Sequence, residues 1–312
     1  MTSFNDIIAA AERIKPFIHR TPVLGSTQIN QITAATIFFK CENFQKVGAF
    51  KMRGASNAIA MLNNHQLDKG VATHSSGNFA QALALAAKLR GIPAYIVMPE
   101  NSSQVKFNAV RSYNGNIIPC KPNLQAREST LNEIVQKTGA TFLHPYNNHN
   151  VIAGQGTATL ELLSEINNLD MIIAPLGGGG LLSGTLIAAK GFNDKIIVYG
   201  AEPIAADDGF RSFKAGKIIP SVNPNTIADG LLTSLGDLTF PIIQKYCDDI
   251  LTVDENSIIS AMKLIWERMK IIIEPSSAVP LAAVMENPDL FKDKTIGIII
   301  SGGNVDLQKL PF

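Results

Sequence analysis

The stretch Met171-Ile172-Ile173-Ala174-Pro175-Leu176-Gly177-Gly178-Gly179-Gly180-Leu181-Leu182 indicates the class of fold. Its first four residues form an apolar run typical of a buried β-strand, and an apolar helical pattern follows from Leu181 to Lys190. Between them, Gly177 to Gly180 allow successive backbone N–H groups to converge on an anion at the electropositive start of a helix. We therefore predict a strand, a loop suited to a phosphate group and a helix. A tight structural turn is the alternative.

The same alternation of strand and helix is found along most of the chain. Helical patterns of about 10–15 residues separate short apolar strands, which is typical of βαβ units on a parallel sheet. It continues with a helix from Gln155 to Ile166 and ends with the very apolar strand from Thr295 to Ile300. Residues 209–239 are richer in Gly, Pro and Asn and are predicted to form long connections. The pattern predicts an α/β protein with two lobes.

The composition favours a small-molecule partner. The chain of 312 residues has 27 basic and 26 acidic residues, so its net charge of +1 gives no field that would attract nucleic acid or an anionic membrane. No apolar stretch approaches the ~18 residues needed to span a membrane. The three cysteines are widely spaced without a CxxC motif, and the five histidines are scattered. These features predict a cytoplasmic protein with reduced thiols and without a transition-metal cluster.

Lys51 is the candidate reactive group, in the stretch Gly48-Ala49-Phe50-Lys51-Met52-Arg53-Gly54. A lysine between a bulky aromatic side chain and small residues can lie in a partly desolvated pocket. There its amine loses its charge more easily and can condense with a carbonyl group as a Schiff base. Taken alone, a single lysine in a turn is far more often a solvated surface group.

Two further polar loops follow predicted strands, Ser75-Ser76-Gly77-Asn78 and Ser301-Gly302-Gly303-Asn304. The hydroxyl and N–H groups of the first can hold a carboxylate at a helix start, although an ordinary helix cap has the same composition. Ligands of open α/β sheets bind outside the carboxyl ends of the strands, where both loops and the four glycines lie. A Schiff-base lysine combined with these loops suits a phosphorylated aldehyde.

A competing interpretation takes Gly178, Gly180 and Glu202 as a dinucleotide fingerprint, with the acid on a ribose hydroxyl. This would make the chain a nicotinamide-dependent dehydrogenase. The third glycine of the fingerprint is absent, because Ser183 takes its place. A ligand-binding sensor that has lost turnover is the alternative outside catalysis, and the intact Lys51 argues against it.

The motifs resemble those of the fold-type-II pyridoxal-phosphate enzymes, which are tryptophan synthase β-like, and within them the serine racemase and serine/threonine dehydratase group. The resemblance implies a large cofactor-binding domain made of residues 1–54 and 146–312, and a small domain of residues 55–145 that closes over the substrate. It also implies a homodimer. Besides the three loops and the Lys51 stretch, it is carried by residues 151–157, 201–203, 227–230, 273–276 and 301–306.

The resemblance implies a role for each site residue. Lys51 is expected to carry pyridoxal phosphate and, once substrate displaces it, to take the α-proton. The other cofactor contacts are expected to be Phe50 beside the ring, Asn78 on the 3-hydroxyl, Gly177, Gly178, Gly179 and Gly180 on the phosphate, and Ser301 on the pyridine nitrogen. The substrate carboxylate is expected on Ser75, Ser76, Gly77 and Asn78.

Two further expectations follow from the same resemblance. In racemase-like members a serine at the place of Ser76 stands opposite the lysine and can return a proton from the other face. Glu202, the carbonyl of Ala206 and Asp208 match a divalent-cation site beside the phosphate loop, whose hard oxygen ligands suit Mg²⁺, or else Ca²⁺ or Mn²⁺.

Two residues depart from the pattern of the group. Phe79 stands where most members have histidine. Tyr146 stands where mammalian-type racemases have asparagine. Ser76 favours a racemase, whereas an aromatic residue at Tyr146 is common in dehydratases.

We therefore predict a lyase that converts L-serine or L-threonine to a 2-oxo acid and ammonia, with serine racemisation as a second or even the main activity. The alternative within the group is a 3-hydroxyaspartate dehydratase, which needs a basic partner that the sequence does not identify. An O-acetylserine sulfhydrylase is disfavoured, because that group usually has threonine-rich loops.

Overall fold

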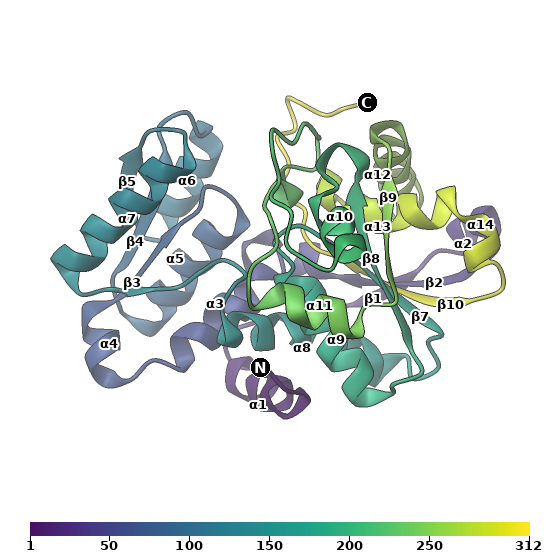
Figure 1. Cartoon of the computed structure of the whole chain (residues 1–312), viewed down its shortest axis with the longest axis horizontal. Helices are drawn as coiled ribbons and strands as arrows, with labels where there is room; N and C mark the ends of the chain where they lie inside the picture. The colour runs from purple at the N-terminus through teal and green to yellow at the C-terminus, as the bar shows by residue number, and fades with distance from the viewer.

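Two separate β-sheets divide the molecule into two lobes, as Figure 1 shows. The computed structural model describes residues 1–312. The strands of the smaller sheet lie between residues 71 and 142, and those of the larger sheet come from both sides of this segment. The α/β class and the two lobes predicted from the sequence are therefore confirmed.

The small lobe contains a four-stranded parallel sheet in the order β5-β4-β3-β6. Separate buried apolar clusters cover its two faces. Its strands are β3 (Val71–His74), β4 (Ala94–Pro99), β5 (Asn116–Cys120) and β6 (Thr141–Phe142), and its helices are α4 (Asn64–Lys69), α5 (Asn78–Arg90), α6 (Gln104–Ser112) and α7 (Leu124–Thr138).

The large lobe contains a six-stranded sheet in the order β1-β2-β10-β7-β8-β9, in which only the edge strand β1 is antiparallel. The sheet is buried on both faces, which explains the continuous apolar runs of its central strands. Its strands are β1 (Val23–Gly25), β2 (Thr36–Cys41), β7 (Met171–Pro175), β8 (Ile197–Pro203), β9 (Asp249–Val253) and β10 (Thr295–Ile300).

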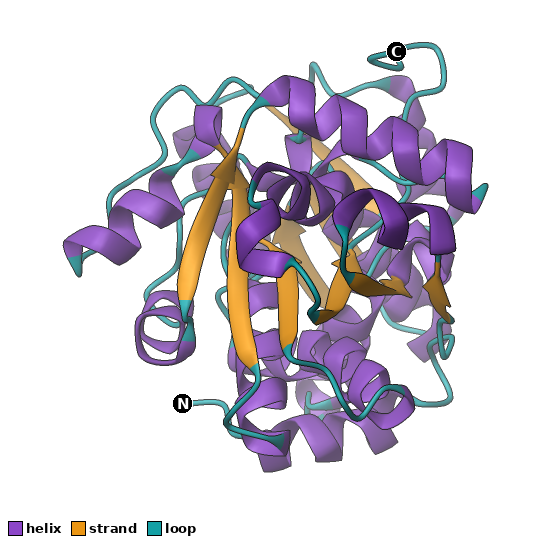
Figure 2. Cartoon of the chain, turned by 90° about the vertical axis from the view of Figure 1, so that its right-hand side faces the viewer, coloured by secondary structure: helices purple, strands orange, loops and turns teal.

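Helices cover both faces of this sheet, and the strands run between the helical layers in Figure 2. Successive strand residues point to opposite faces, so Ile173 packs into one apolar cluster and Ile172 into the other. One face is covered by α2 (Thr27–Thr33), α12 (Glu255–Met269), α13 (Pro275–Glu286) and α14 (Pro288–Phe291), and the other by α1 (Phe4–Ile14), α8 (His149–Glu165), α9 (Gly180–Phe192) and α11 (Thr239–Tyr246).

Helix α8 packs between α9 and α3 (Lys51–Ala60) at glycine contacts. A Cβ atom on Gly154 would lie 2.6 Å from the carbonyl oxygen of Arg53 in α3, and one on Gly184 would lie 2.5 Å from the nitrogen of Gly156. Such distances require glycine, because the backbones themselves are in contact. This packing fixes the helix that begins at Lys51 relative to the helix that begins at the glycine loop.

Three details differ from the sequence-based predictions. Helix α8 begins at His149, before Gln155, because the side chain of Asn148 accepts from the N–H groups of Asn150 and Val151 and caps the helix. The segment predicted as connections contains the eight-residue helix α10 (Asp208–Ala215), which is too short to show a clear period. The helix α11 and the strand β9 were not predicted. None of the helices combines the length and the apolar character that a membrane span requires.

Candidate active site

The site is built on a short antiparallel contact between residues 47–50 and residues 301–304, which follow β10. Ala49 and Gly302 form a β-bridge, the N–H group of Phe50 donates to the Ser301 carbonyl oxygen at 2.9 Å, and that of Gly303 donates to the Gly48 oxygen at 2.9 Å. The chain turns sharply at the start of this contact, with φ of 59° at Val47 and 68° at Gly48. The contact holds the residue that follows Phe50 at the carboxyl end of β10.

That residue is Lys51, the first residue of α3. Its Nζ donates to the carbonyl oxygen of Pro145 at 3.1 Å and lies 4.9 Å from the centre of the Phe50 ring and 5.9 Å from that of Phe79. Burial lowers the pKa of the Lys51 amine to about 8, and the negative charge of Glu274 opposes this change only in part. A substantial fraction of neutral amine is therefore present at mildly alkaline pH, as a nucleophile or general base requires.

The four-glycine loop, residues 177–180, presents bare backbone N–H groups. Gly178, Gly179 and Gly180 are buried, yet none of the N–H groups of the loop donates to an acceptor in the chain. Tyr146 packs on the loop so closely that a Cβ atom on Gly178 would lie 2.5 Å from its ring. Buried N–H groups without partners are rare in proteins, and such a group at the start of α9 fits an anion.

Asn78, the first residue of α5, is held by two residues of the large lobe. Its Nδ2 donates to both carboxylate oxygens of Glu274 at 3.0 Å, and its Oδ1 accepts from Nδ2 of Asn304 at 2.9 Å. Burial raises the pKa of Glu274 to about 7, although the hydrogen bond from Asn78 opposes the change. Asn78 therefore connects the two lobes across the site.

Ser301 is buried, with 3% of its surface exposed, and lies directly after β10. Its Oγ lies 2.9 Å from Oγ of Ser277, which also accepts from the N–H group of Gly302 at 2.8 Å. The hydroxyl of Ser301 is therefore held by a neighbour that itself has a fixed position.

The residues predicted to hold a substrate carboxylate, Ser75 to Asn78, follow β3, end at the first residue of α5 and are partly exposed. The N–H group of Gly77 donates weakly to Oγ of Ser75, at 3.4 Å. The hydroxyl of Ser76 has no hydrogen-bond partner in the chain, so it is free to act on a ligand.

The predicted metal ligands lie where β8 ends and α10 begins. The Glu202 carboxylate accepts from the N–H group of Phe210, whereas Oδ2 of Asp208 is buried without a partner. Burial raises the pKa of Glu202 to about 9 and that of Asp208 to about 6. Ala206 is buried beside them in η3 (Ile204–Ala206). No group of three or more His, Cys, Asp or Glu side chains gathers as a metal centre, so backbone or water oxygens would have to complete a site.

Two groups near the site were not identified from the sequence. Glu274 belongs to a motif that was noted, but only the fold places it against Asn78. Arg127, in the first turns of α7, has a buried Nε atom without a partner. Burial lowers the pKa of His74, the residue before Ser75, and the positive charge of Arg127 lowers it further. Arg127 therefore lies close to the Ser75 loop.

Residues 14–302 match the family described as pyridoxal-phosphate dependent enzymes. The chain belongs to this family. It is 50% identical over 310 residues to a beta-hydroxyaspartate dehydratase of Paracoccus denitrificans, covering 99% of this chain and 98% of the relative. The crystal structure of serine racemase from Dictyostelium discoideum matches with a TM-score of 0.95 and 53% identity, over 98% and 99% of the two chains. The crystal structure of a T.th. threonine deaminase matches with a TM-score of 0.94 and 40% identity, over 98% and 99%.

The residues present fit the cofactor of the family. A phosphate group fits the unpartnered N–H groups of residues 177–180, and an aldehyde fits the amine of Lys51, whose pKa is lowered. The dehydrogenase interpretation is wrong. The carboxylate of Glu202 faces the N–H group of Phe210 and the Cα atom of Gly209, where a Cβ atom would lie 2.8 Å from Oε2, so it is packed inside the chain.

A methyl group on the glycine loop tests this assignment. Gly178→Ala is expected to weaken pyridoxal phosphate binding by roughly tenfold or more, since the Cβ atom must displace the Tyr146 ring and crowd the N–H groups. Affinity is measured by absorbance titration of the apoprotein. Pyridoxal without phosphate is the matched control ligand, and its weaker binding is expected to change little. An equal loss for both ligands would contradict a phosphate role for the loop.

Proposed function

We propose that the chain is an ammonia-lyase that removes water from L-serine or L-threonine, giving a 2-oxo acid and ammonia, and that it also racemises serine. The observation that carries the proposal is the Lys51 amine with its lowered pKa, together with the Ser75–Asn78 loop. In this loop Oγ of Ser75 accepts one weak hydrogen bond from the N–H group of Gly77, whereas the hydroxyl of Ser76 has no partner in the chain. Serine, threonine and hydroxyaspartate, named for the three relatives, share a hydroxyl group on Cβ. A β-hydroxy amino acid is therefore the substrate class that best fits the chain.

The residues of the site divide the work as follows. Pyridoxal phosphate, when bound, supplies the electron sink that makes the Cα–H bond acidic. Lys51 would hold the cofactor and then take the α-proton, for which its pKa near 8 is suited. Residues 75–78 would bind the substrate carboxylate at the start of α5, where the helix dipole is positive. Ser301 would face the pyridine nitrogen as a neutral group.

Ser76 would return a proton from the face opposite Lys51 and so allow racemisation. Ser76→Ala is then expected to lower D-serine formation from L-serine by roughly 10²–10⁴-fold, the usual effect of losing a general acid. Pyruvate formation is expected to fall less than about tenfold, because elimination needs only Lys51. Both products are measured in the same incubation.

Ser75→Ala is the matched control for Ser76, since a lost carboxylate contact lowers both products together. Unchanged D-serine formation in Ser76→Ala, with the control behaving as expected, would contradict the two-base proposal.

Arg127 favours 3-hydroxyaspartate as a second candidate substrate. Its buried Nε atom lacks a partner, and its charge acts on His74 beside the Ser75 loop. A second carboxylate on the substrate would satisfy this atom through a charge-assisted hydrogen bond. The 50% identity to a beta-hydroxyaspartate dehydratase is consistent with this candidate.

Substrate comparison separates the two candidates. Arg127→Met is expected to lower kcat/KM for 3-hydroxyaspartate by roughly 10–100-fold, since hydrogen bonds to charged groups contribute about 1.5–3 kcal/mol. Turnover of L-serine should stay within about threefold. Arg111→Met, an exposed arginine on α6, is the control and should change neither reaction. Equal losses for serine and hydroxyaspartate would show that Arg127 does not read the second carboxylate.

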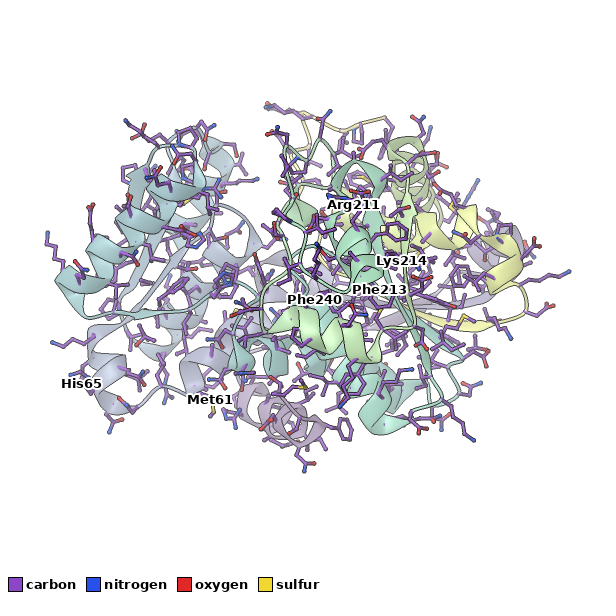
Figure 3. The ribbon with its side chains drawn as sticks, in the orientation of Figure 1. Met61, His65, Arg211, Phe213, Lys214 and Phe240 are labelled. Carbon is purple, nitrogen blue, oxygen red and sulfur yellow. The ribbon has the colours of Figure 1, made fainter.

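We also propose that Glu202, the carbonyl of Ala206 and Asp208 bind Mg²⁺, with Ca²⁺ or Mn²⁺ as alternatives. Two buried carboxylates without a cationic partner are destabilising, and their raised pKa values express that penalty. The nearest arginine on α10, Arg211, pairs with Asp207 at 2.7 Å and leaves Asp208 unpaired. Figure 3 shows Arg211 on this helix together with Phe213 and Lys214.

Thermal unfolding tests the cation. Mg²⁺ at about 100 times its dissociation constant should stabilise the wild-type protein by about 2.7 kcal/mol. The response should be larger at pH 8 than at pH 6, because protons compete for Asp208, whose pKa is about 6, and for Glu202. Asp208→Asn should lose the response, whereas Asp207→Asn should keep it, because Asp207 precedes α10 and its carboxylate pairs with Arg211. An undiminished response in Asp208→Asn would contradict the site.

Three wider features complete the proposal. Residues 55–145 would close over the substrate as a small domain and exclude water. A second copy of the chain would cover exposed apolar groups such as Phe44 and Ile272, which are 45% and 48% exposed, to form a homodimer. The three cysteines are free and buried, which suits a cytoplasmic location.

A further inference from the structure

Glu274 is a buried carboxylate at the start of α13, with 4% of its surface exposed and no Lys or Arg in ion-pair contact. Its space is made by glycines, since a Cβ atom on Gly302 would lie 3.0 Å from both carboxylate oxygens. Its partners are the Asn78 side chain and the N–H group of Asn304, which donates to Oε2 at 3.2 Å. A carboxylate in this setting destabilises the fold, which indicates a purpose other than stability.

The hydrogen bonds around Glu274 fix which way the Asn78 amide faces. An ionised carboxylate only accepts, so the NH₂ group of Asn78 must face Glu274. On the other side, Nδ2 of Asn304 donates to the Val47 carbonyl oxygen at 2.8 Å as well as to Oδ1 of Asn78 at 2.9 Å. If the Asn78 amide were reversed, its oxygen would face the carboxylate of Glu274 and its NH₂ group would face the NH₂ group of Asn304. Nδ2 of Asn78 lies 3.0 Å from each oxygen of the same carboxylate, so one N–H group can serve both oxygens in a bifurcated hydrogen bond and leave the other for a ligand.

The arrangement also depends on the two lobes being together. Asn78 belongs to α5 of the small lobe, whereas Glu274, Asn304 and Val47 belong to the large lobe. A second contact between the lobes lies nearby, because Lys106 of α6 pairs with Asp229 of η4 (Asp229–Leu231) at 2.9 Å. The amide of Asn78 therefore takes its fixed orientation only where α5 meets the large lobe.

We propose that Glu274 is a positioning residue for the cofactor: it orients the Asn78 amide so that an N–H group, and not a carbonyl oxygen, is offered to the bound ring. The proposal rests on the proposed function and on the contact between Asn78 and the 3-hydroxyl of the cofactor that the family resemblance implies. The 3-oxygen of the ring is an acceptor, so only this orientation gives a favourable contact. In this role Glu274 would act through Asn78 and not on the substrate directly.

Glu274→Gln has nearly the same shape and breaks this arrangement. Oε2 of Glu274 accepts from both Asn78 and Asn304, whereas Oε1 accepts from Asn78 alone. A glutamine places its NH₂ group against one of these donors whichever way it turns. Asn78 is then no longer held in one orientation.

Two properties of Glu274→Gln are expected to change in opposite directions. Its affinity for pyridoxal phosphate should fall at least about tenfold, and the absorption band of the bound cofactor should shift, because the ring oxygen loses an oriented donor. The stability of the apoprotein should instead increase relative to wild type, because a buried charge without a cation is removed. A merely structural role for Glu274 would lower both.

The pH dependence of apoprotein stability gives the second readout. Folding raises the pKa of Glu274 from 4.5 to about 7, so the folded state holds the proton more tightly than the unfolded state. Wild type should therefore lose stability relative to Glu274→Gln as the pH rises from about 4.5 to 7, and the difference should persist above pH 7. The negative charge of Asp229 raises the pKa of Glu274 further, and the positive charge of Lys106 lowers it. The other charged group that acts on Glu274 is Lys51.

The experiment compares wild type, Glu274→Gln, Asn304→Ala and the control Glu267→Gln, an exposed carboxylate on α12. Cofactor affinity and spectrum come from absorbance titration, and apoprotein stability from thermal unfolding between pH 5 and 8. Asn304→Ala leaves Glu274 in place, frees Oδ1 of Asn78 and should also weaken cofactor binding. The proposal would be overturned if Glu274→Gln and Asn304→Ala both kept the wild-type cofactor affinity and spectrum. It would also be overturned if the stability of wild type and of Glu274→Gln depended on pH in the same way. A wild-type protein that binds no pyridoxal phosphate would overturn the proposed function instead.

Discussion

The antiparallel contact between residues 47–50 and residues 301–304 is the constraint on which the site depends. Lys51 follows it directly, Ser301 is part of it, and the N–H group of Glu274 donates to the carbonyl oxygen of Gly302 at 3.0 Å. Three groups from distant parts of the chain therefore take their positions from one piece of backbone. Because backbone hydrogen bonds are short and directional, they hold these groups more rigidly than side-chain packing alone would.

Two kinds of buried charge lie near Lys51: charges that form ion pairs, and a carboxylate that has no cationic partner. Beyond the site, Arg53 is fully buried and pairs with Glu42 at 2.7 Å and with Glu161 at 2.8 Å, and Lys40 pairs with Glu161 at 2.7 Å. Each charge in this group has a partner, so the group anchors α3 without disturbing the site. Within the site, the carboxylate of Glu274 has no cationic partner. Such unbalanced charges are found where a protein binds or converts a ligand.

Much of the fold was predictable from the sequence, because its helices and strands are long and strongly patterned. The glycine loop, Lys51 and Asn78 were found for a related reason, since each lies in a short motif next to a strand or helix end. The family and the cofactor expected from these motifs are confirmed, whereas the roles of the individual residues remain predictions. Short elements such as α10 and the strand β9 were missed, because a few residues cannot establish a period.

Contacts between distant residues could not be predicted. Glu274 lies 196 residues from Asn78, and nothing in its own neighbourhood in the sequence indicates that contact. Arg127 is one of several arginines on helices, and only the packing of α7 beside β3 brings it near the Ser75 loop. Such pairings depend on how the two lobes fold and meet.

The most direct measurement is the site of covalent attachment of the cofactor. The protein is loaded with pyridoxal phosphate, reduced with borohydride, digested and analysed by mass spectrometry. We expect one phosphopyridoxyl group per chain, on the peptide that contains Lys51. Attachment at another lysine, or a loaded protein without any modified peptide, would contradict it.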